Sequence, residues 1–153
     1  MPGTFSQIYI QFVFAVKGRQ NFLLPSFEQE VHKYMSGIIK EKDQKPLAIN
    51  GMSDHIHILV GLKPVMRIAD LIRDIKNNST NFINSKNWLK QKFCWQEGYG
   101  AFSYSQSSFG NVIDYIKNQK IHHAKFSFKK EYFSLLKKFE IPFEEKYLFD
   151  FYD

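Results

Sequence analysis

Two histidines two positions apart are the first residues whose types and spacing suggest chemistry. His55 and His57 lie in the apolar stretch Asp54-His55-Ile56-His57-Ile58-Leu59-Val60, whose composition predicts a β-strand. Alternate residues of a strand project from the same face, so both imidazoles point the same way. Two neutral imidazoles can bind a divalent cation and leave its coordination shell open, as a Lewis acid requires. Such pairs also occur as surface or hydrogen-bonded residues, so this motif alone is a weak indicator.

A second cluster lies in a predicted helix. Tyr115 and Gln119 are four residues apart and therefore share one helix face, with Asn111 a turn earlier. The apolar stripe of this helix consists of Val112, Ile113 and Ile116. Tyr115 lies at or beyond the edge of that stripe, where it is either a boundary packing residue or a free nucleophile. Because the pKa of a phenol is about 10, a nearby cation would be needed to activate it, and Gln119 is a candidate third metal ligand.

Hydrophobic periodicity predicts the elements that position these residues. Strands are expected at 5–16, 47–52 and 55–62, with an interrupted strand or hairpin at 93–96 and 100–104. Helices are expected at 27–40, 67–82, from Ser107 or Ser108 to about Lys120, and 127–139, the first with a capping box of Ser26 and Gln29. This order predicts an α+β fold, a ferredoxin-like or RRM-like antiparallel sheet with helices packed mainly on one face.

Length and composition limit the possible classes of protein. A chain of 153 residues with 44% hydrophobic residues predicts a single domain over 1–153, in which 127–153 form a C-terminal helix and tail. The net charge of +6 favours a polyanionic partner. The one cysteine, Cys94, excludes an internal disulfide, and we expect it to be buried. No apolar run is long enough to span a membrane and no signal peptide is evident, so we expect a cytoplasmic protein without a membrane partner.

Three motifs in one order resemble a known family. They are His55-Ile56-His57, the stretch from Trp95 to Ser103, and Tyr115 to Gln119 followed by Ile121-His122-His123. Together they resemble the single-tyrosine HUH transposases of the insertion-sequence 200/605 family, from about Tyr9 to Phe126. Each motif is weak alone, whereas the three together are specific.

The resemblance implies a homodimeric, metal-dependent DNA transposase that binds hairpins near the ends of a mobile element and cuts single-stranded DNA. Tyr115 would be the catalytic nucleophile, forming a 5′-phosphotyrosine link, and His55, His57 and Gln119 would hold Mg²⁺ or Mn²⁺. In this family the tyrosine helix of one subunit can act in trans on the histidines of the other. Two imidazoles and an amide are not the all-oxygen set that Mg²⁺ prefers, so we expect weak metal binding without DNA.

Further residues flank these motifs. Asp54 could orient a histidine as a second-shell acceptor or form a turn, and Asn111 is a second candidate for the second shell. His122 and His123 could contact DNA phosphate or cap a helix C-terminus. The candidate DNA-binding residues are Lys117, Lys120, His122, His123, Lys125, Lys129 and Lys130. Clustered cations of this kind would make DNA binding salt-dependent, although a solvated basic face is the alternative.

Two other functions compete with the transposase. One is a domesticated relative of the same chemistry that processes chromosomal repeats as a nickase. The other is a non-catalytic module that binds single-stranded nucleic acid, in which exposed aromatic rings stack on bases and the histidines are incidental. The module predicts metal-independent binding and no cleavage.

Overall fold

The computed structural model describes residues 3–144 and 148. The strands are β1 (Tyr9–Ala15), β2 (Lys45–Met52), β3 (His55–Gly61) and β4 (Gly100–Tyr104). The α-helices are α1 (Glu28–Glu41), α2 (Ile68–Ser85), α3 (Phe109–Lys117), α4 (Gln119–His123) and α5 (Phe128–Lys138), with short 3-10 helices η1 (Lys17–Arg19) and η2 (Gln106–Ser108). No helix in this described part of the chain is long and apolar enough to cross a membrane.

The four strands form one antiparallel sheet in the order β2-β3-β1-β4, which confirms the predicted α+β, ferredoxin-like fold. The central strand β1 pairs with β3 on one side and β4 on the other. In this register Gln11 lies opposite Leu59 and Phe102, and Val13 lies opposite His57. Because directly opposed residues share a face, the register places both histidines on the same side as Gln11.

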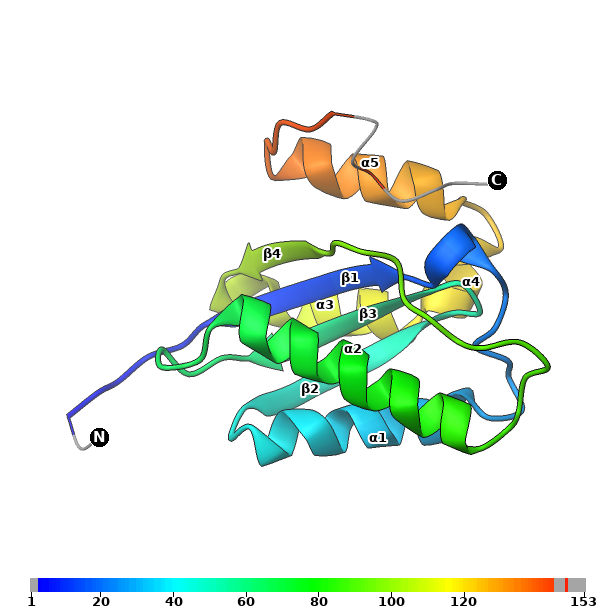
Figure 1. The fold of residues 1–153 in the computed structure, drawn as a ribbon. Helices are drawn as coiled ribbons and strands as arrows, with labels where there is room; N and C mark the ends of the chain where they lie inside the picture. Colours follow the sequence, from blue (N-terminus) through cyan, green and yellow to red (C-terminus); the bar gives the residue numbers. More distant parts are fainter. Residues whose placement is uncertain (1–2, 145–147, 149–153) are drawn as a thin grey trace.

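The other side of the sheet carries the main core. Phe12, Phe14, Ile56 and Ile58 are completely buried there. The two long helices α1 and α2 cover this side (Figure 1). Their buried residues recur at helical spacing, as in the Leu71, Ile72 and Ile75 stripe of α2. This layer agrees with the prediction that the helices pack mainly on one face.

Shorter helices cover the histidine side of the sheet, which Figure 1 shows behind and above the strands. α3 packs Val112 and Ile116 against Leu59 of β3. α5 packs against β4, with the rings of Phe102 and Tyr132 6.4 Å apart, centroid to centroid. The face of the sheet that carries the histidines is therefore covered by α3 and α4 together with α5.

Local predictions were wrong at four points. Residues 93–96 form no strand, and only Trp95 makes an isolated bridge, to Val16. α1 begins without a side-chain cap, so Ser26 and Gln29 form no capping box. The third helix ends at Lys117, and Asn118 (φ −97°, ψ 22°) separates it from α4, so Tyr115 and Gln119 lie on two helices. Cys94 is exposed. By contrast, Ser127 caps α5 by accepting a hydrogen bond from Lys130 N at 3.2 Å; much of the predicted C-terminal tail lies outside the described residues.

Candidate metal and nucleophile site

His55 and His57 project from β3 into a buried site and are 1% and 0% exposed. Each ring has its Nδ1 against an oxygen: His55 Nδ1 lies 2.8 Å from Asp54 Oδ1, and His57 Nδ1 lies 2.7 Å from Gln11 Oε1. A carboxylate can only accept here, so Nδ1 of His55 carries the ring proton. The same tautomer of His57 is favoured by the amide oxygen of Gln11. Both Nε2 atoms thereby face the centre of the site, where each can bind either a proton shared with Glu131 or a metal ion.

Tyr115 and Gln119 reach the same site from α3 and α4. The Tyr115 ring lies 5.9 Å from the His57 ring, centroid to centroid. Gln119 is completely buried, and its Oε1 lies 3.4 Å from His55 Nε2. α3 ends before Asn118 and α4 begins after it, yet Tyr115 of α3 lies beside His57 and Gln119 of α4 lies beside His55. A single chain therefore supplies all four residues.

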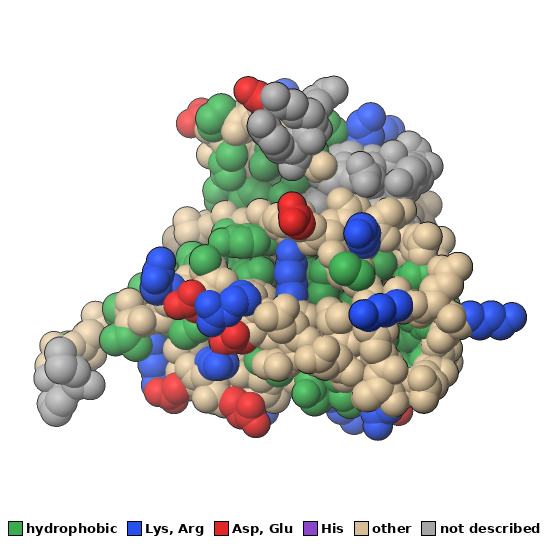
Figure 2. All heavy atoms as spheres, in the orientation of Figure 1, with side chains coloured by type: hydrophobic (Ala, Val, Ile, Leu, Met, Phe, Trp, Pro, Cys, Tyr) green, Lys and Arg blue, Asp and Glu red, His purple; other side chains and the backbone are tan. Residues whose placement is uncertain are grey.

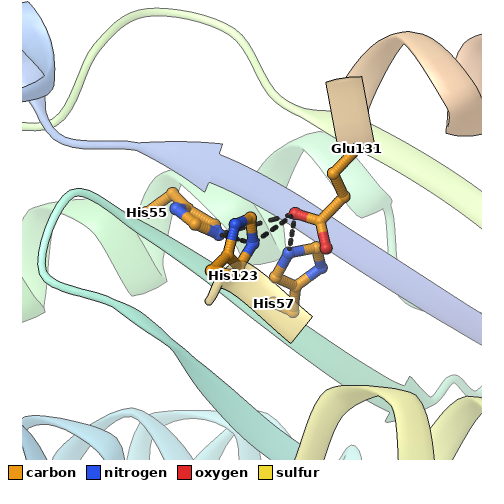
Figure 3. Close-up of side chains that lie close together, drawn as sticks. All are labelled: His55, His57, His123 and Glu131. Carbon is orange, nitrogen blue, oxygen red and sulfur yellow. Dashed lines mark hydrogen bonds and ion pairs between the residues drawn. The ribbon is translucent and has the colours of Figure 1, made fainter. Parts of the chain in front are cut away.

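Glu131 descends from α5 into the centre of the site (Figure 3). Its Oε1 lies 2.9 Å from His57 Nε2 and 3.0 Å from His123 Nε2. Its Oε2 accepts hydrogen bonds from the Tyr115 hydroxyl and, at 3.0 Å, from Gln119 Nε2. A carboxylate that is 4% exposed requires such partners, because an unpaired buried charge is costly.

The proton affinities follow from this packing. Burial alone would raise the pKa of Glu131, but the charge of His57 and hydrogen bonds from the histidines hold it far below its usual range. Burial, together with the charge of Glu131, raises the pKa of Tyr115. Burial lowers the pKa of His57, whereas in His55 hydrogen bonds to Asp54 and Glu131 outweigh burial and raise it. The tyrosine is thus a neutral phenol until a cation favours its phenolate.

A cavity of about 500 Å³ leads to this site between α3 and α5. Its wall includes the Tyr115 ring, Glu131, Phe126 and Lys130, with Asn111 nearer the surface. The volume falls within the usual range for ligand pockets. Tyr115 is therefore accessible to a ligand from this side.

The surface around the cavity is cationic. Lys130 and Lys138 line the cavity, and Lys117, Lys120, Lys125 and Lys129 are exposed in the segment that joins α3 to α5 or at its ends. The only acidic residue between 117 and 138 is the buried Glu131. On the face of α1 and α2, by contrast, Lys and Arg are interspersed with Asp and Glu (Figure 2). A polyanion is therefore favoured on the cavity side.

The donor set fits a metal ion. His55, His57, His123 and Glu131 place one donor atom each within 4.8 Å of one another. Imidazole nitrogen and carboxylate oxygen are common ligands of divalent cations. Gln119 Oε1 is a further neutral donor beside His55.

The profile of the family described as "Transposase IS200 like" matches residues 4–119, which include His55, His57, Tyr115 and Gln119. The chain belongs to the IS200-like transposase family. Solved structures agree with this assignment at the level of the fold. This family member superimposes on a candidate transposase from Deinococcus radiodurans R1 with a TM-score of 0.65 at 22% identity, covering 78% of this chain and 95% of the other.

A second solved structure is that of a REP-associated tyrosine transposase bound to a REP hairpin. Its TM-score is 0.60 at 17% identity, over 80% of this family member and 73% of the other chain. Identities this low show a common fold and assign no residue a role. No curated protein sequence matches this family member.

The predicted site residues of this IS200-like protein fall into two groups. Those at the centre are His55, His57, Tyr115, Gln119, Asp54 and His123. Others line the cavity or the surface: Asn111, His122, Lys117, Lys125, Lys129 and Lys130. The Lys120 ammonium already contacts other residues of the protein: its Nζ lies 3.1 Å from Glu28 Oε2 and 2.6 Å from the Gly51 carbonyl oxygen.

Two residues of the site were missed in the sequence of this IS200-like protein. Glu131 carried a signal, because it occupies the apolar stripe Phe128, Glu131, Tyr132 and Leu135, where an acidic residue is unexpected. Gln11 carried a weaker one, as a polar residue within an apolar strand. Neither signal indicates which residue Glu131 or Gln11 contacts. That contact, with His57 in both cases, follows only from the packing of α5 and β1 against β3.

Proposed function

We propose that this protein is a DNA transposase that cleaves and rejoins single-stranded DNA at the hairpin-bearing ends of a mobile element. The observation that carries the proposal is the position of Tyr115, which lines the cavity and whose hydroxyl meets the Glu131 carboxylate beside His57. Membership of the IS200-like transposase family supports it. We place the protein in the cytoplasm, where its DNA would be.

In the proposed reaction the Tyr115 oxygen attacks a backbone phosphorus. The bond between phosphorus and the 3′-oxygen breaks. The DNA piece that keeps the phosphate on its 5′ end stays attached to Tyr115 as a phosphotyrosine, and the other piece leaves with a free 3′-OH. Glu131 already accepts a hydrogen bond from the phenol, so it is placed to take the phenol proton and to return it to the leaving 3′-oxygen. In the reverse direction a 3′-OH attacks the phosphotyrosine and restores Tyr115, so rejoining needs no external energy source.

A divalent ion, Mg²⁺ or Mn²⁺, would polarise the scissile phosphate and favour the phenolate. His55 and His57 would hold it through Nε2, with Gln119 supplying an amide oxygen. Asp54 and Gln11 orient the two rings through Nδ1. Outer hydrogen bonds of this kind typically affect metal affinity by about 10- to 100-fold.

Hairpin DNA is the substrate that we propose. A protein of the same fold has been seen with a REP hairpin bound, and the lysines around the cavity suit a phosphate backbone. Processing of chromosomal repeats by the same chemistry is the alternative that this comparison favours. Hairpins from an element end and from a dispersed repeat, offered in competition, would distinguish the two.

We propose a homodimer whose sites are each assembled in cis. The family resemblance implied that the tyrosine helix could act in trans, but here Tyr115 and Gln119 lie against the histidines of their own chain. Mixing Tyr115→Phe with His57→Ala subunits tests this arrangement. Cis assembly predicts no recovered cleavage, whereas recovery would show that the helix is exchanged.

The test of the function is a cleavage assay on end-labelled single-stranded DNA that carries the hairpins. We expect a covalent complex of protein and DNA with wild-type protein and Mg²⁺ or Mn²⁺, and none with EDTA or with Tyr115→Phe. Tyr132→Phe, a matched change on α5, should still form the complex. Tight, metal-independent binding without any covalent complex would instead support a non-catalytic binding module.

A further inference from the structure

The strongest unassigned feature is the pair of side chains that α4 and α5 add to the two histidines. His123 and Glu131 lie beyond residues 4–119, the part of the chain that the family profile matches. Both nevertheless point at His55 and His57, as Figure 3 shows. We propose that His123 and Glu131 join His55 and His57 as ligands of a first-row transition-metal ion, which binds before any DNA arrives.

The distances between donor atoms fit a single ion. Tetrahedral bonds of about 2.0–2.2 Å to nitrogen and oxygen place neighbouring donors about 3.3 Å apart. The observed separations are 3.1 Å for His55 Nε2 to His123 Nε2, 2.9 Å for His57 Nε2 to Glu131 Oε1 and 3.5 Å for His55 Nε2 to Glu131 Oε1. All four donor atoms lie within 4.8 Å of one another, so the ion is admitted when the shortest of these contacts open and the widest close.

The outer hydrogen bonds fix which nitrogen of each ring is free. His123 Nδ1 lies 2.9 Å from the Phe126 carbonyl oxygen, which can only accept, so this nitrogen carries the proton. His55 has the same arrangement with Asp54, and His57 with Gln11. Three Nε2 lone pairs and a carboxylate therefore converge on one point. A metal-bound histidine usually has its other nitrogen held in this way.

Converging lone pairs require a positive charge between them. His55 Nε2 and His123 Nε2 are 3.1 Å apart, and two unprotonated nitrogens at that distance repel each other. Either a proton or a metal ion resolves the contact. The carboxylate of Glu131 and the near-complete burial of the donors favour the ion, since a doubly charged cation satisfies four donors at once.

The donor set selects the class of metal. Mg²⁺ prefers oxygen ligands in an octahedron and retains several waters. Three imidazoles and one carboxylate suit Zn²⁺, Co²⁺ or Mn²⁺ better. The sequence predicted weak binding without DNA because only two histidines and an amide were recognised as ligands. With four donors, binding no longer depends on oxygens from DNA.

This inference rests on the proposed function and deepens it: the ion would be the one that strand transfer uses, and it would expand from four to five ligands to take a phosphate oxygen. Its test needs no DNA. Protein stripped of metal is titrated with Zn²⁺, Co²⁺, Mn²⁺ or Mg²⁺ by calorimetry, and the visible spectrum of the Co²⁺ form reports its geometry. We expect one ion per chain, the strong absorption of tetrahedral Co²⁺, and weaker binding of Mg²⁺ than of the other three.

The variants decide between metal and proton. Glu131→Gln and His123→Asn should each weaken Co²⁺ binding by at least about tenfold, as even outer-sphere changes commonly do. Glu30→Gln, an exposed glutamate of α1, should bind as the wild type does. Unfolding curves of the metal-free proteins show whether each variant folds. If Glu131→Gln does not fold, Glu131→Asp replaces it. The same loss of affinity is expected, because the shorter aspartate side chain cannot bring its carboxylate to the ion.

Wild-type affinity in both ligand variants, or no ion bound without DNA, would overturn the inference. In the second case a proton takes the place between the histidines. These outcomes differ from a failure of the proposed function. A protein that binds the ion through four donors but never links to DNA would keep the metal site and lose the transposase.

Discussion

His32 makes the stability of the fold depend on pH in a way that can be calculated. It lies on the buried side of α1, and burial lowers its pKa from 6.5 to about 4. Of its charged neighbours, Glu28 opposes this change and Lys120 reinforces it. Lys120 also bridges Glu28 to the Gly51 carbonyl oxygen. The histidine therefore reports on the contact between α1 and α4, the helix that carries Gln119.

The sign follows from the two protonation states. Above the unfolded value of 6.5 the ring is neutral in both states and costs nothing. As the pH falls toward about 4, His32 binds a proton in the unfolded chain but not in the folded chain, so the free energy of unfolding falls. The two pKa values differ by about 2.5, and each pKa unit corresponds to about 1.4 kcal/mol, so the full effect is about 3.5 kcal/mol; about 3 kcal/mol of it is reached at a pH of about 4, where the folded ring is itself half protonated.

The assay is urea unfolding of wild type and His32→Gln at several pH values from about 7 to about 4. EDTA is present so that metal release from the other histidines does not contribute. We expect the variant to lose about 3 kcal/mol less than the wild type over this range. Glu30→Gln serves as the control on the same helix. Parallel curves for wild type and His32→Gln would refute the reasoning, because they would mean that the folded chain protonates His32 as readily as the unfolded one.

Other predictions concern the site directly. In metal-free protein, Glu131→Gln should lower the pKa of Tyr115, because the carboxylate charge that helps raise it is lost; an unchanged titration of its ring carbon by NMR would contradict this. A Cβ added at Gly51 would collide with the backbone carbonyl of His55, so Gly51→Ala should cost about 3 kcal/mol in urea unfolding and weaken Co²⁺ binding; a wild-type curve would count against the close approach. Lys130→Ala should reduce the salt dependence of single-stranded DNA binding by about one unit of slope, while an exposed lysine of α1 should not; equal slopes would place the DNA elsewhere.

The sequence was sufficient where periodicity alone decides the structure. Alternation in β3 correctly put His55 and His57 on one face, and the order of elements gave the ferredoxin-like sheet. The position of Tyr115 at the edge of the apolar stripe correctly indicated a side chain that is not part of the main core. These features depend on neighbours that are close in sequence or on regular strand geometry.

Other features depend on contacts that no local pattern encodes. The helix break at Asn118 leaves Gln119 beside His55 even though the expected continuous helix is absent. Glu131 meets His57 across 74 positions of sequence, and an acidic residue on an apolar stripe does not reveal what pairs with it. Its role had to come from the packing of α5 against the sheet.

The most direct test of the central claim is to identify the residue that becomes linked to DNA. Covalent complexes formed with a labelled hairpin substrate and Mn²⁺ are digested with protease and nuclease, and the nucleotide-bearing peptide is sequenced by mass spectrometry. The account predicts a 5′-phosphate ester on Tyr115 and a free 3′-OH on the released strand. A link to any other residue, or a complex with the opposite polarity, would contradict it.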